Sequence, residues 1–263
     1  METGAKAKLI WIPESTSDLF LRAAGLAVFG IRFFKEVFAP PYEIKETLRQ
    51  CFAIGYKSLS LVSITGFIIG LTLTLQSIPT LSKFGAQSLV PSMVALALIL
   101  EIGPVITSLI FAGKIGSSIG AEIGSMRVTE QVDAMEVSGT NPFKYLVVTR
   151  VAATTIMLPL LVIYADVIGL FGGYLASSFT SDTSIKLFFI NAFSSITLKD
   201  LLPSLIKTFF FGYAVGVVGC YEGYNATKGT ESVGIAANTA VVVSSLLVII
   251  IDMINVQVMT IIF

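Results

Sequence analysis

Long apolar runs dominate the pattern of hydrophobic and polar positions along this chain. A helix needs about 20 consecutive apolar residues to cross a bilayer, and five runs approach or reach that length: residues 58–78, 89–112, 151–176, 203–221 and 233–260. The runs are unbroken and do not alternate with period two, which favours helices over the strands of a β-barrel. The sequence therefore predicts an all-α integral membrane protein with five transmembrane helices.

A further apolar segment, residues 15–38, is interrupted by charged side chains. These charges fall within an arc of roughly 140° on a helical wheel, so one side of the helix is polar. Such asymmetry is typical of a helix that lies in the membrane interface, and we expect it to face lipid through Phe20, Leu26, Phe33, Phe34 and Val37. A tilted sixth span is the alternative, at the cost of placing charges within the bilayer. The predicted organisation is an N-terminal cytoplasmic segment with this interfacial helix, 1–50, and a five-span domain, 51–263.

The composition agrees with a membrane protein and excludes several kinds of chemistry. Charged residues make up 13% of the chain, whereas soluble domains carry about 25%. The chain has no His and only two Cys, which argues against Ser-His-Asp triads and common metal sites. Lys and Arg balance Asp and Glu at 17 each, so no basic surplus points to nucleic acid. Because the GxxxxGK[ST] motif is missing, we expect no P-loop for ATP on this chain. We also find no paired nucleophile and base that would support an intramembrane enzyme.

The basic residues are unevenly distributed between the two ends of the predicted spans. With the N-terminus in the cytoplasm, 13 of the 17 Lys and Arg residues fall in the inner segments and three in the outer segments. Basic residues accumulate on the cytoplasmic side of membrane proteins. The sequence therefore predicts a cytoplasmic N-terminus and, after five spans, a C-terminus on the opposite side.

The longest inner segment, residues 113–150, contains a regular series of glycines. Gly116, Gly120 and Gly124 recur every four residues, so they share one helix face on which another helix can approach closely. Packing within the subunit is the simplest interpretation of this face.

A short amphipathic helix is predicted next, near 126–138. Thr129 is placed to cap its N-terminus, with Glu130 and Asp133 favoured in the first turn by the helix dipole, and Gly139 and Pro142 follow its end. One interpretation is an ordinary solvated loop helix. The other is a docking helix that receives force from a separate cytoplasmic ATPase.

Three carboxylates lie within the predicted spans: Glu101, Asp166 and Asp252. An ionised side chain at the bilayer centre costs at least about 2.5–3.5 kcal/mol on insertion scales, so each is expected to face protein, water or a ligand. Hydrogen bonds to Ser, Thr or backbone groups of neighbouring helices would satisfy them. Alternatively they form a polar lining for a ligand, or Glu101 carries protons in an ion-coupled secondary transporter.

The stretch GKIGSSIGAEIGSMRVTEQVDAMEVSGTNPFKYLVVTRVAATTIMLPLL, residues 113–161, closely resembles the MlaE family of ABC transporter permeases. The resemblance continues through LEIGPV at 100–105 and GIAANTAVV at 234–242, and it covers roughly residues 40–258. The family often has Arg before the Glu of its E-[LIM]-G-P motif, where this chain has Leu100.

This resemblance implies a five-span permease that acts as a homodimer with two copies of a separate ABC ATPase, which binds ATP and Mg²⁺. It also implies a periplasmic MCE-domain protein, in some systems a STAS-domain subunit, an inner-membrane location with a periplasmic C-terminus, and transport of phospholipid or a related hydrophobic lipid between membranes. The chain itself would hold no catalytic residue, metal or cofactor. The region that matches the coupling helix contains Arg127, Thr129, Glu130, Gln131, Asp133 and Glu136.

The resemblance also bears on the carboxylates within the spans. It implies that Glu101 lines a lipid pocket, and we take Asp166 and Asp252 as further candidates for that pocket. Because Leu100 replaces the usual Arg, a headgroup phosphate needs another cation. Lys207, near the predicted outer end of the fourth span, is our candidate for it.

Overall fold

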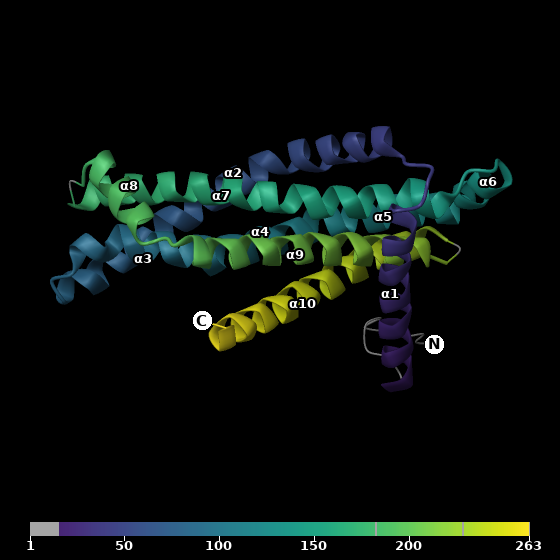
Figure 1. Cartoon of the computed structure of the whole chain (residues 1–263). Coiled ribbons are helices and arrows are strands. Elements are labelled where there is room, and N and C mark those ends of the chain that lie inside the picture. Colours follow the sequence, from purple (N-terminus) through teal and green to yellow (C-terminus); the bar gives the residue numbers. More distant parts are fainter. Residues whose placement is uncertain (1–15, 182, 228, 263) are drawn as a thin grey trace, which may run out of the picture.

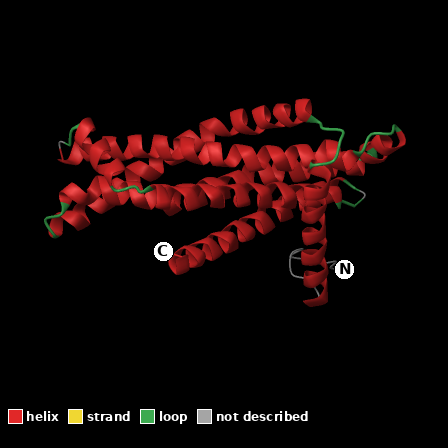
Figure 2. Ribbon diagram, viewed as in Figure 1, coloured by secondary structure: helices red, strands yellow, loops and turns green. Residues whose placement is uncertain are grey.

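The computed structural model describes residues 16–181, 183–227 and 229–262, so residues 1–15 of the predicted N-terminal segment lie outside it. Within these ranges the chain forms helices joined by short loops and contains no strand (Figure 2). The α-helices are α1 (Thr16–Val37), α2 (Ile44–Lys83), α3 (Val90–Ala97), α4 (Gly103–Phe111), α5 (Ser117–Val128), α6 (Gln131–Val137), α7 (Thr149–Ser181), α8 (Ile185–Ser194), α9 (Leu198–Tyr224) and α10 (Thr230–Ile262). Short 3₁₀ or π segments adjoin some of them: η1 (Gln87–Leu89), η2 (Leu98–Ile102), η3 (Ala112–Gly116) and η4 (Phe143–Val148).

Five helical stretches in the described part of the chain are long and apolar enough to cross a membrane: Ile44–Lys83, Gln87–Val128, Phe143–Thr180, Leu198–Tyr224 and Thr230–Ile261. This confirms the five predicted spans, and α1 is not among the five. Each stretch extends beyond its predicted apolar run, because a helix can continue into the headgroup region, where polar side chains meet water. The second span is a composite in which η2 and η3 interrupt the α-helical geometry.

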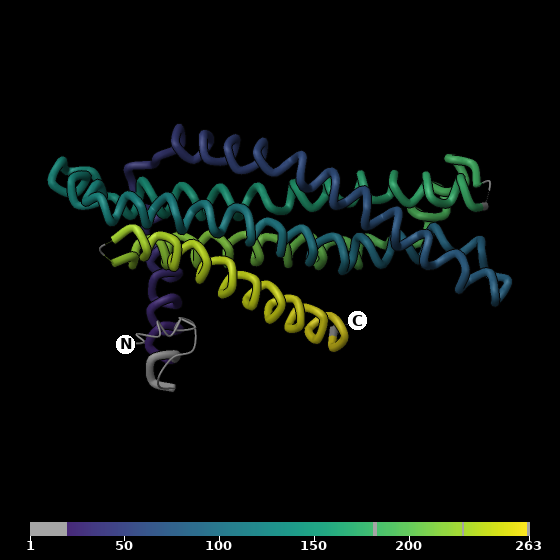
Figure 3. Tube along the Cα trace, turned by 180° about the vertical axis from the view of Figure 1, so that it is seen from behind, coloured from purple at the N-terminus to yellow at the C-terminus, as the bar shows by residue number. Residues whose placement is uncertain are grey.

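The spans form an elongated bundle (Figures 1 and 3). α2 packs along α7, α7 packs along α9, and α9 contacts both α5 and α10. α6 extends beyond the bundle at one end, and α8 lies against α3 at the opposite end. α10 begins at the α6 end and diverges from the bundle toward its C-terminus (Figure 3).

α1 runs crosswise to the long axis of the bundle, near the α6 end (Figure 1). This orientation is the one expected of a helix that lies along a membrane surface. Three of the five side chains predicted to face lipid instead pack against the protein: Leu26, Phe33 and Val37. Phe33 is 6% exposed, and its ring centroid lies 5.7 Å from that of Tyr213 on α9. The prediction that these three side chains face lipid was wrong, because this part of α1 packs against the bundle, including α9. The other two, Phe20 and Phe34, are exposed.

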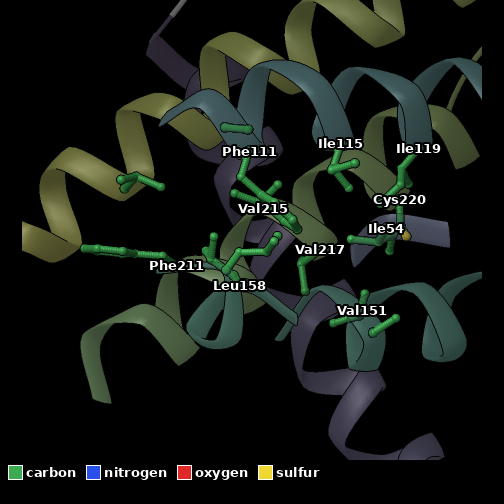
Figure 4. Packing of buried hydrophobic residues seen from close by; sticks show 14 of the residues in the cluster. Ile54, Phe111, Ile115, Ile119, Val151, Leu158, Phe211, Val215, Val217 and Cys220 are labelled. Carbon is green, nitrogen blue, oxygen red and sulfur yellow. The ribbon is translucent and has the colours of Figure 1, made fainter. Parts of the chain in front are cut away.

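The largest cluster of buried apolar side chains lies among α2, α5, α7 and α9, with contributions from the neighbouring short segments (Figure 4). It brings together Phe111, Ile119, Val151, Phe211 and Val215, which are at most 4% exposed. The outward faces of the spans carry exposed apolar side chains instead. This distribution suits a bundle whose outer surface contacts lipid and whose stability depends on close internal packing.

α2 and α7 approach so closely that side chains are excluded between them. A Cβ atom on Gly70 would overlap the carbonyl oxygen of Gly169, and a Cβ on Gly66 would lie 2.8 Å from the carbonyl oxygen of Ala165. Small residues permit this approach of two backbones in a membrane. The glycines therefore fix the separation of the first and third spans.

Substitution of Gly70 by Ala is expected to lower the free energy of unfolding by about 1–3 kcal/mol, because the added methyl group forces the two backbones apart. Gly113→Ala is the matched control, since a Cβ there meets no described atom within 4 Å apart from those of its chain neighbours and its own helical turns. Thermal unfolding of the purified variants in detergent measures both effects. Equal unfolding temperatures for Gly70→Ala and the control would contradict the close packing of α2 on α7.

Candidate functional site

Three charged side chains from three helical segments meet inside the bundle, and we call Glu101, Lys207 and Asp252 the charge cluster. Lys207 Nζ donates hydrogen bonds to Glu101 Oε2 at 2.8 Å and to Asp252 Oδ1 at 2.9 Å. The Lys207 side chain is 1% exposed, against 46% for Glu101 and 19% for Asp252. The cluster thus joins η2, α9 and α10, and Glu101 is its most accessible member.

The structure gives Lys207 two partners that the sequence did not predict. Lys207 was predicted to offer a cation to a headgroup phosphate, but it is buried and its ammonium group is shared by two carboxylates. An ion removed from water loses several kcal/mol of solvation, which only well-placed partners offset. A ligand that reaches the cluster would therefore meet the carboxylate of Glu101 before the ammonium of Lys207.

Glu101 lies on η2, a single π-helical turn within the second span. The Gly103 N–H bonds to the carbonyl of Leu98, and Pro104 has no N–H with which to bond the carbonyl of Leu100. Single π turns of this kind occur frequently at functional sites. The sequence Gly103-Pro104 therefore places an irregular helical turn at the carboxylate.

Ser204 of α9 compensates for this irregular turn. Its hydroxyl donates to the carbonyl oxygen of Ile99 at 2.7 Å and approaches that of Leu100 at 3.4 Å. Ser204 and Lys207 are three residues apart and share a face of α9, so one face both completes the backbone hydrogen bonding of η2 and pairs with Glu101. Sequence reasoning missed Ser204, although its helical spacing from Lys207 was a usable signal.

Asp166 of α7 is not part of the charge cluster. It is 9% exposed, and within the described residues its Oδ1 has no hydrogen-bond partner. It lines a largely apolar cavity of about 240 Å³, together with Ile99, Leu170, Phe193 and Ser204 among others. The cavity and the charge cluster therefore both adjoin the η2 turn, since Ile99 and Glu101 belong to that turn and Ser204 contacts it.

Asp166→Asn is expected to raise the thermal unfolding temperature. The substitution keeps the shape of the side chain and removes a carboxylate without a partner from apolar surroundings, a change worth about 1 kcal/mol or more. Asp200→Asn is the contrasting control, because Asp200 Oδ2 accepts a hydrogen bond from the Thr197 N–H at 3.3 Å at the start of α9, and its loss should be slightly destabilising. A lower unfolding temperature for Asp166→Asn would show that the carboxylate is stabilised in the folded protein.

The predicted docking helix is divided in the structure. α5 ends at Val128, and the hydroxyl of Thr129 donates to the Ser125 carbonyl at 2.8 Å. Glu130 then adopts a left-handed conformation with φ of 60°, and α6 begins at Gln131. The prediction that Thr129 caps the N-terminus of the short helix was wrong, because Thr129 instead belongs to the C-terminal end of the preceding helix.

α6 is attached to the bundle by few contacts and exposes most of its surface. Arg127 forms an ion pair with Asp133, and the Arg127 guanidinium lies 5.9 Å from the ring centroid of Tyr224 on α9. Val132 is fully buried, whereas Val137 is 91% exposed. The remaining predicted coupling residues on α6 are exposed: Gln131, Asp133 and Glu136. α6 extends beyond the end of the bundle (Figure 1). Its exposed acidic and apolar side chains are therefore presented away from the bundle.

The predicted glycine face of α5 lies against α10 of the same chain. A Cβ on Gly120 would lie 3.2 Å from the carbonyl oxygen of Ala236, and a Cβ on Gly124 would lie 3.7 Å from the Cα of Val233. At Gly116 the neighbours include Ser244 of α10 and Val215 of α9. The helix that leads into α6 is therefore closely packed against the helix that carries Asp252.

The sequence profile of the family described as Permease MlaE matches residues 47–258. The chain belongs to the MlaE permease family. A probable ABC transporter permease protein of Rickettsia typhi is 40% identical over 232 residues, which cover 88% of this chain and 90% of the relative. The intermembrane phospholipid transport system permease protein MlaE of Haemophilus influenzae is 33% identical over 244 residues, covering 91% and 93%. Protein TRIGALACTOSYLDIACYLGLYCEROL 1, chloroplastic, of Arabidopsis thaliana is 32% identical over 239 residues, covering 91% and 68%.

Membership of the MlaE family confirms the resemblance detected in the sequence and makes the chain an ABC transporter permease. The matched region includes all but the outermost residues of the five spans, α6 and all members of the charge cluster. The family assignment therefore applies to the part of the molecule in which the candidate site lies.

Proposed function

We propose that this MlaE-family permease is the membrane subunit of an ATP-driven transporter that moves phospholipid or a related hydrophobic lipid between membranes. The observation that carries the proposal is the charge cluster, a polar site built within membrane-spanning helices beside an apolar cavity. The name of the Haemophilus influenzae relative, an intermembrane phospholipid transport permease, supports the substrate class.

The two neighbouring sites suit the two parts of a lipid. Glu101 offers an accessible carboxylate that accepts hydrogen bonds from hydroxyl, amide or ammonium groups of a headgroup. The cavity beside Asp166 offers apolar walls, such as Leu170 and Phe193, to an acyl chain. Because η2 contributes Ile99 to the cavity and Glu101 to the charge cluster, a change in the position of this turn would alter both sites together.

In this proposal the force for transport comes from a partner. A separate ABC ATPase binds ATP and Mg²⁺ and docks on α6 and its connection to α5, which carry the predicted coupling residues. α5 packs on α10 through Gly120, and α10 carries Asp252, so a shift of α6 would displace one carboxylate of the charge cluster relative to Lys207. Rigid helices that shift against one another are a common means of coupling distant sites.

We further propose that the permease acts as a homodimer in the inner membrane, with an MCE-domain protein on the periplasmic side and, in some systems, a STAS-domain subunit on the ATPase. The divergent part of α10 supports a second copy, because toward its C-terminus it leaves the other helices of the bundle (Figure 3), and a second copy would supply helix contacts there. We assign the α6 end and the N-terminus to the cytoplasm, because the inner segments contain an excess of Lys and Arg. The C-terminus is then periplasmic.

Lipids that copurify with the protein test this proposal directly. We expect mass spectrometry of extracts from detergent-purified permease to identify a phospholipid enriched over its share in the membrane, and Glu101→Gln to reduce that enrichment. Asp200→Asn, which lies outside the charge cluster and its neighbouring cavity, is the control. Equal lipid in wild type and Glu101→Gln would contradict the assignment of Glu101 to the lipid site.

Dissipating the proton gradient distinguishes this proposal from the ion-coupled alternative. ATP-driven transport in vesicles should continue when a protonophore is added and ATP is held constant. If transport stops under these conditions, Glu101 acts in an ion-coupled secondary transporter instead.

A further inference from the structure

A second cavity, of about 330 Å³, opens between α2, α5 and the segment from η4 to the start of α7. Its lining residues differ entirely from those of the cavity beside Asp166. Ligand pockets have volumes of about 300–1,000 Å³, so it is large enough for a small polar group. Nothing in the proposed transport route uses this cavity.

We call this second cavity the end pocket. Charged groups of both signs line it: Glu46, Arg49, Lys57, Glu122 and Arg150. Arg150 is the buried member, with a side chain 4% exposed. Its Nη2 donates to Glu122 Oε1 at 2.7 Å and its Nη1 to the Leu146 carbonyl at 3.0 Å. Its Nε has no hydrogen-bond partner among the described residues. The pocket therefore contains a fixed guanidinium group whose hydrogen bonding is incomplete.

Glu46 of the pocket is engaged by Gln50 and Arg49, whereas Arg49 and Lys57 keep unused hydrogen-bond donors. Glu46 accepts from Gln50 Nε2 at 2.8 Å and lies 3.6 Å from Arg49 Nη1. The Arg49 side chain is 78% exposed. Lys57 is exposed, and within the described part of the chain its Nζ makes no hydrogen bond or ion pair. Lys114 adds a further ammonium group nearby, since its Nζ donates to the Lys57 carbonyl. The pocket therefore offers several unused cationic donors, with the exposed carboxylate of Glu122 beside them.

The pocket lies at the edge of the membrane-spanning region. Lys57 immediately precedes the apolar run 58–78, and Lys114 follows the run 89–112 closely. Lys and Arg at this position reach the level of the lipid headgroups. An anion that enters the pocket from the bilayer is therefore a headgroup phosphate.

We propose that this pocket binds the phosphate of a phospholipid from the leaflet at the α6 end, with Arg49 and Lys57 as its main cationic contacts and Arg150 as a fixed donor. Arginine and lysine form strong, charge-assisted hydrogen bonds to phosphate. Glu122, whose side chain is 53% exposed, is placed to receive the ammonium group of an ethanolamine headgroup. The pocket is a second lipid site, distinct from the charge cluster, and its assignment does not depend on transport.

Isothermal titration calorimetry tests this assignment. The purified full-length permease is titrated with dihexanoyl phosphatidylethanolamine. We expect Arg49→Ala combined with Lys57→Ala to weaken binding by at least about tenfold, as the loss of charge-assisted contacts implies. Both side chains are exposed, so these variants retain the packing of the bundle. Lys45→Ala is the matched control, because Lys45 is an exposed lysine of α2 that does not line the pocket.

Further arms of the same titration identify the source of the phosphate and separate the two sites. Inorganic phosphate should bind much more weakly than the lipid. Glu101→Gln should leave the affinity of the end pocket for the lipid unchanged, even if this substitution abolishes transport. Unchanged affinity in the double variant, or equal weakening by Lys45→Ala, would overturn the assignment to this pocket. Inorganic phosphate binding as tightly as the lipid would show a site for free phosphate and overturn the lipid assignment.

Discussion

Lys207→Met is expected to lower the free energy of unfolding by about 3 kcal/mol, near the lower end of the range for breaking a buried ion pair. Met keeps an unbranched side chain that is one heavy atom shorter, but the substitution leaves Glu101 and Asp252 facing each other without the ammonium between them. Glu101 is partly exposed and can be hydrated, which limits the loss of free energy of unfolding. Chemical denaturation in detergent measures this change, and lipid transport should be lost with it.

Two further variants separate charge from packing in this prediction. Lys199→Met, an exposed lysine in the first turn of α9, should leave stability unchanged. Combining Lys207→Met with Glu101→Gln and Asp252→Asn should recover most of the lost stability, because no uncompensated charge remains, but it should not restore transport. A Lys207→Met protein as stable as wild type would show that the charge cluster does not hold the three helices together.

Replacing Asp133 and Glu136 of α6 by Ala is expected to release the ATPase while the permease stays folded. Loss of two charge-assisted contacts at about 1.5 kcal/mol each corresponds to binding weaker by about a hundredfold. Pulldown of the ATPase on immobilised permease measures the affinity, and thermal unfolding confirms that the permease is intact.

Glu231→Ala is the control for the α6 variant, since Glu231 is also an exposed acidic residue but lies in the first turn of α10. It should retain the ATPase. If the ATPase stays bound and active on the Asp133 and Glu136 variant, α6 is not the docking helix.

The spans could be predicted from the sequence because each requires only a long apolar run, which is a local property. Their ends could not be placed by hydropathy, because helices such as α2 continue through polar headgroup and cytoplasmic regions. Thr129 shows a similar limit. A threonine followed by acidic residues fits the N-terminus of one helix, yet the same residue equally ends the helix before it. Only the left-handed turn at Glu130 decides between the two.

The partners of buried groups depend on how distant helices pack, and the sequence contains little signal for them. Glu101, Lys207 and Asp252 were each identified, but their pairing depends on the relative positions of the second, fourth and fifth spans. Asp166 was grouped with them on hydropathy alone, and the structure places it in a separate cavity. The periodicity of α1 likewise revealed an apolar face without showing that α9 covers part of it.

Reconstitution of the purified permease into vesicles, with and without its ATPase, tests the dependence on a separate motor most directly. Transfer of fluorescent phospholipid to acceptor vesicles should require both the ATPase and hydrolysable ATP, and the Asp133 and Glu136 variant should be inactive under the same conditions. ATP-independent lipid transfer by the permease alone, at the rate of the complete system, would contradict the role of this chain as the driven subunit of a transporter.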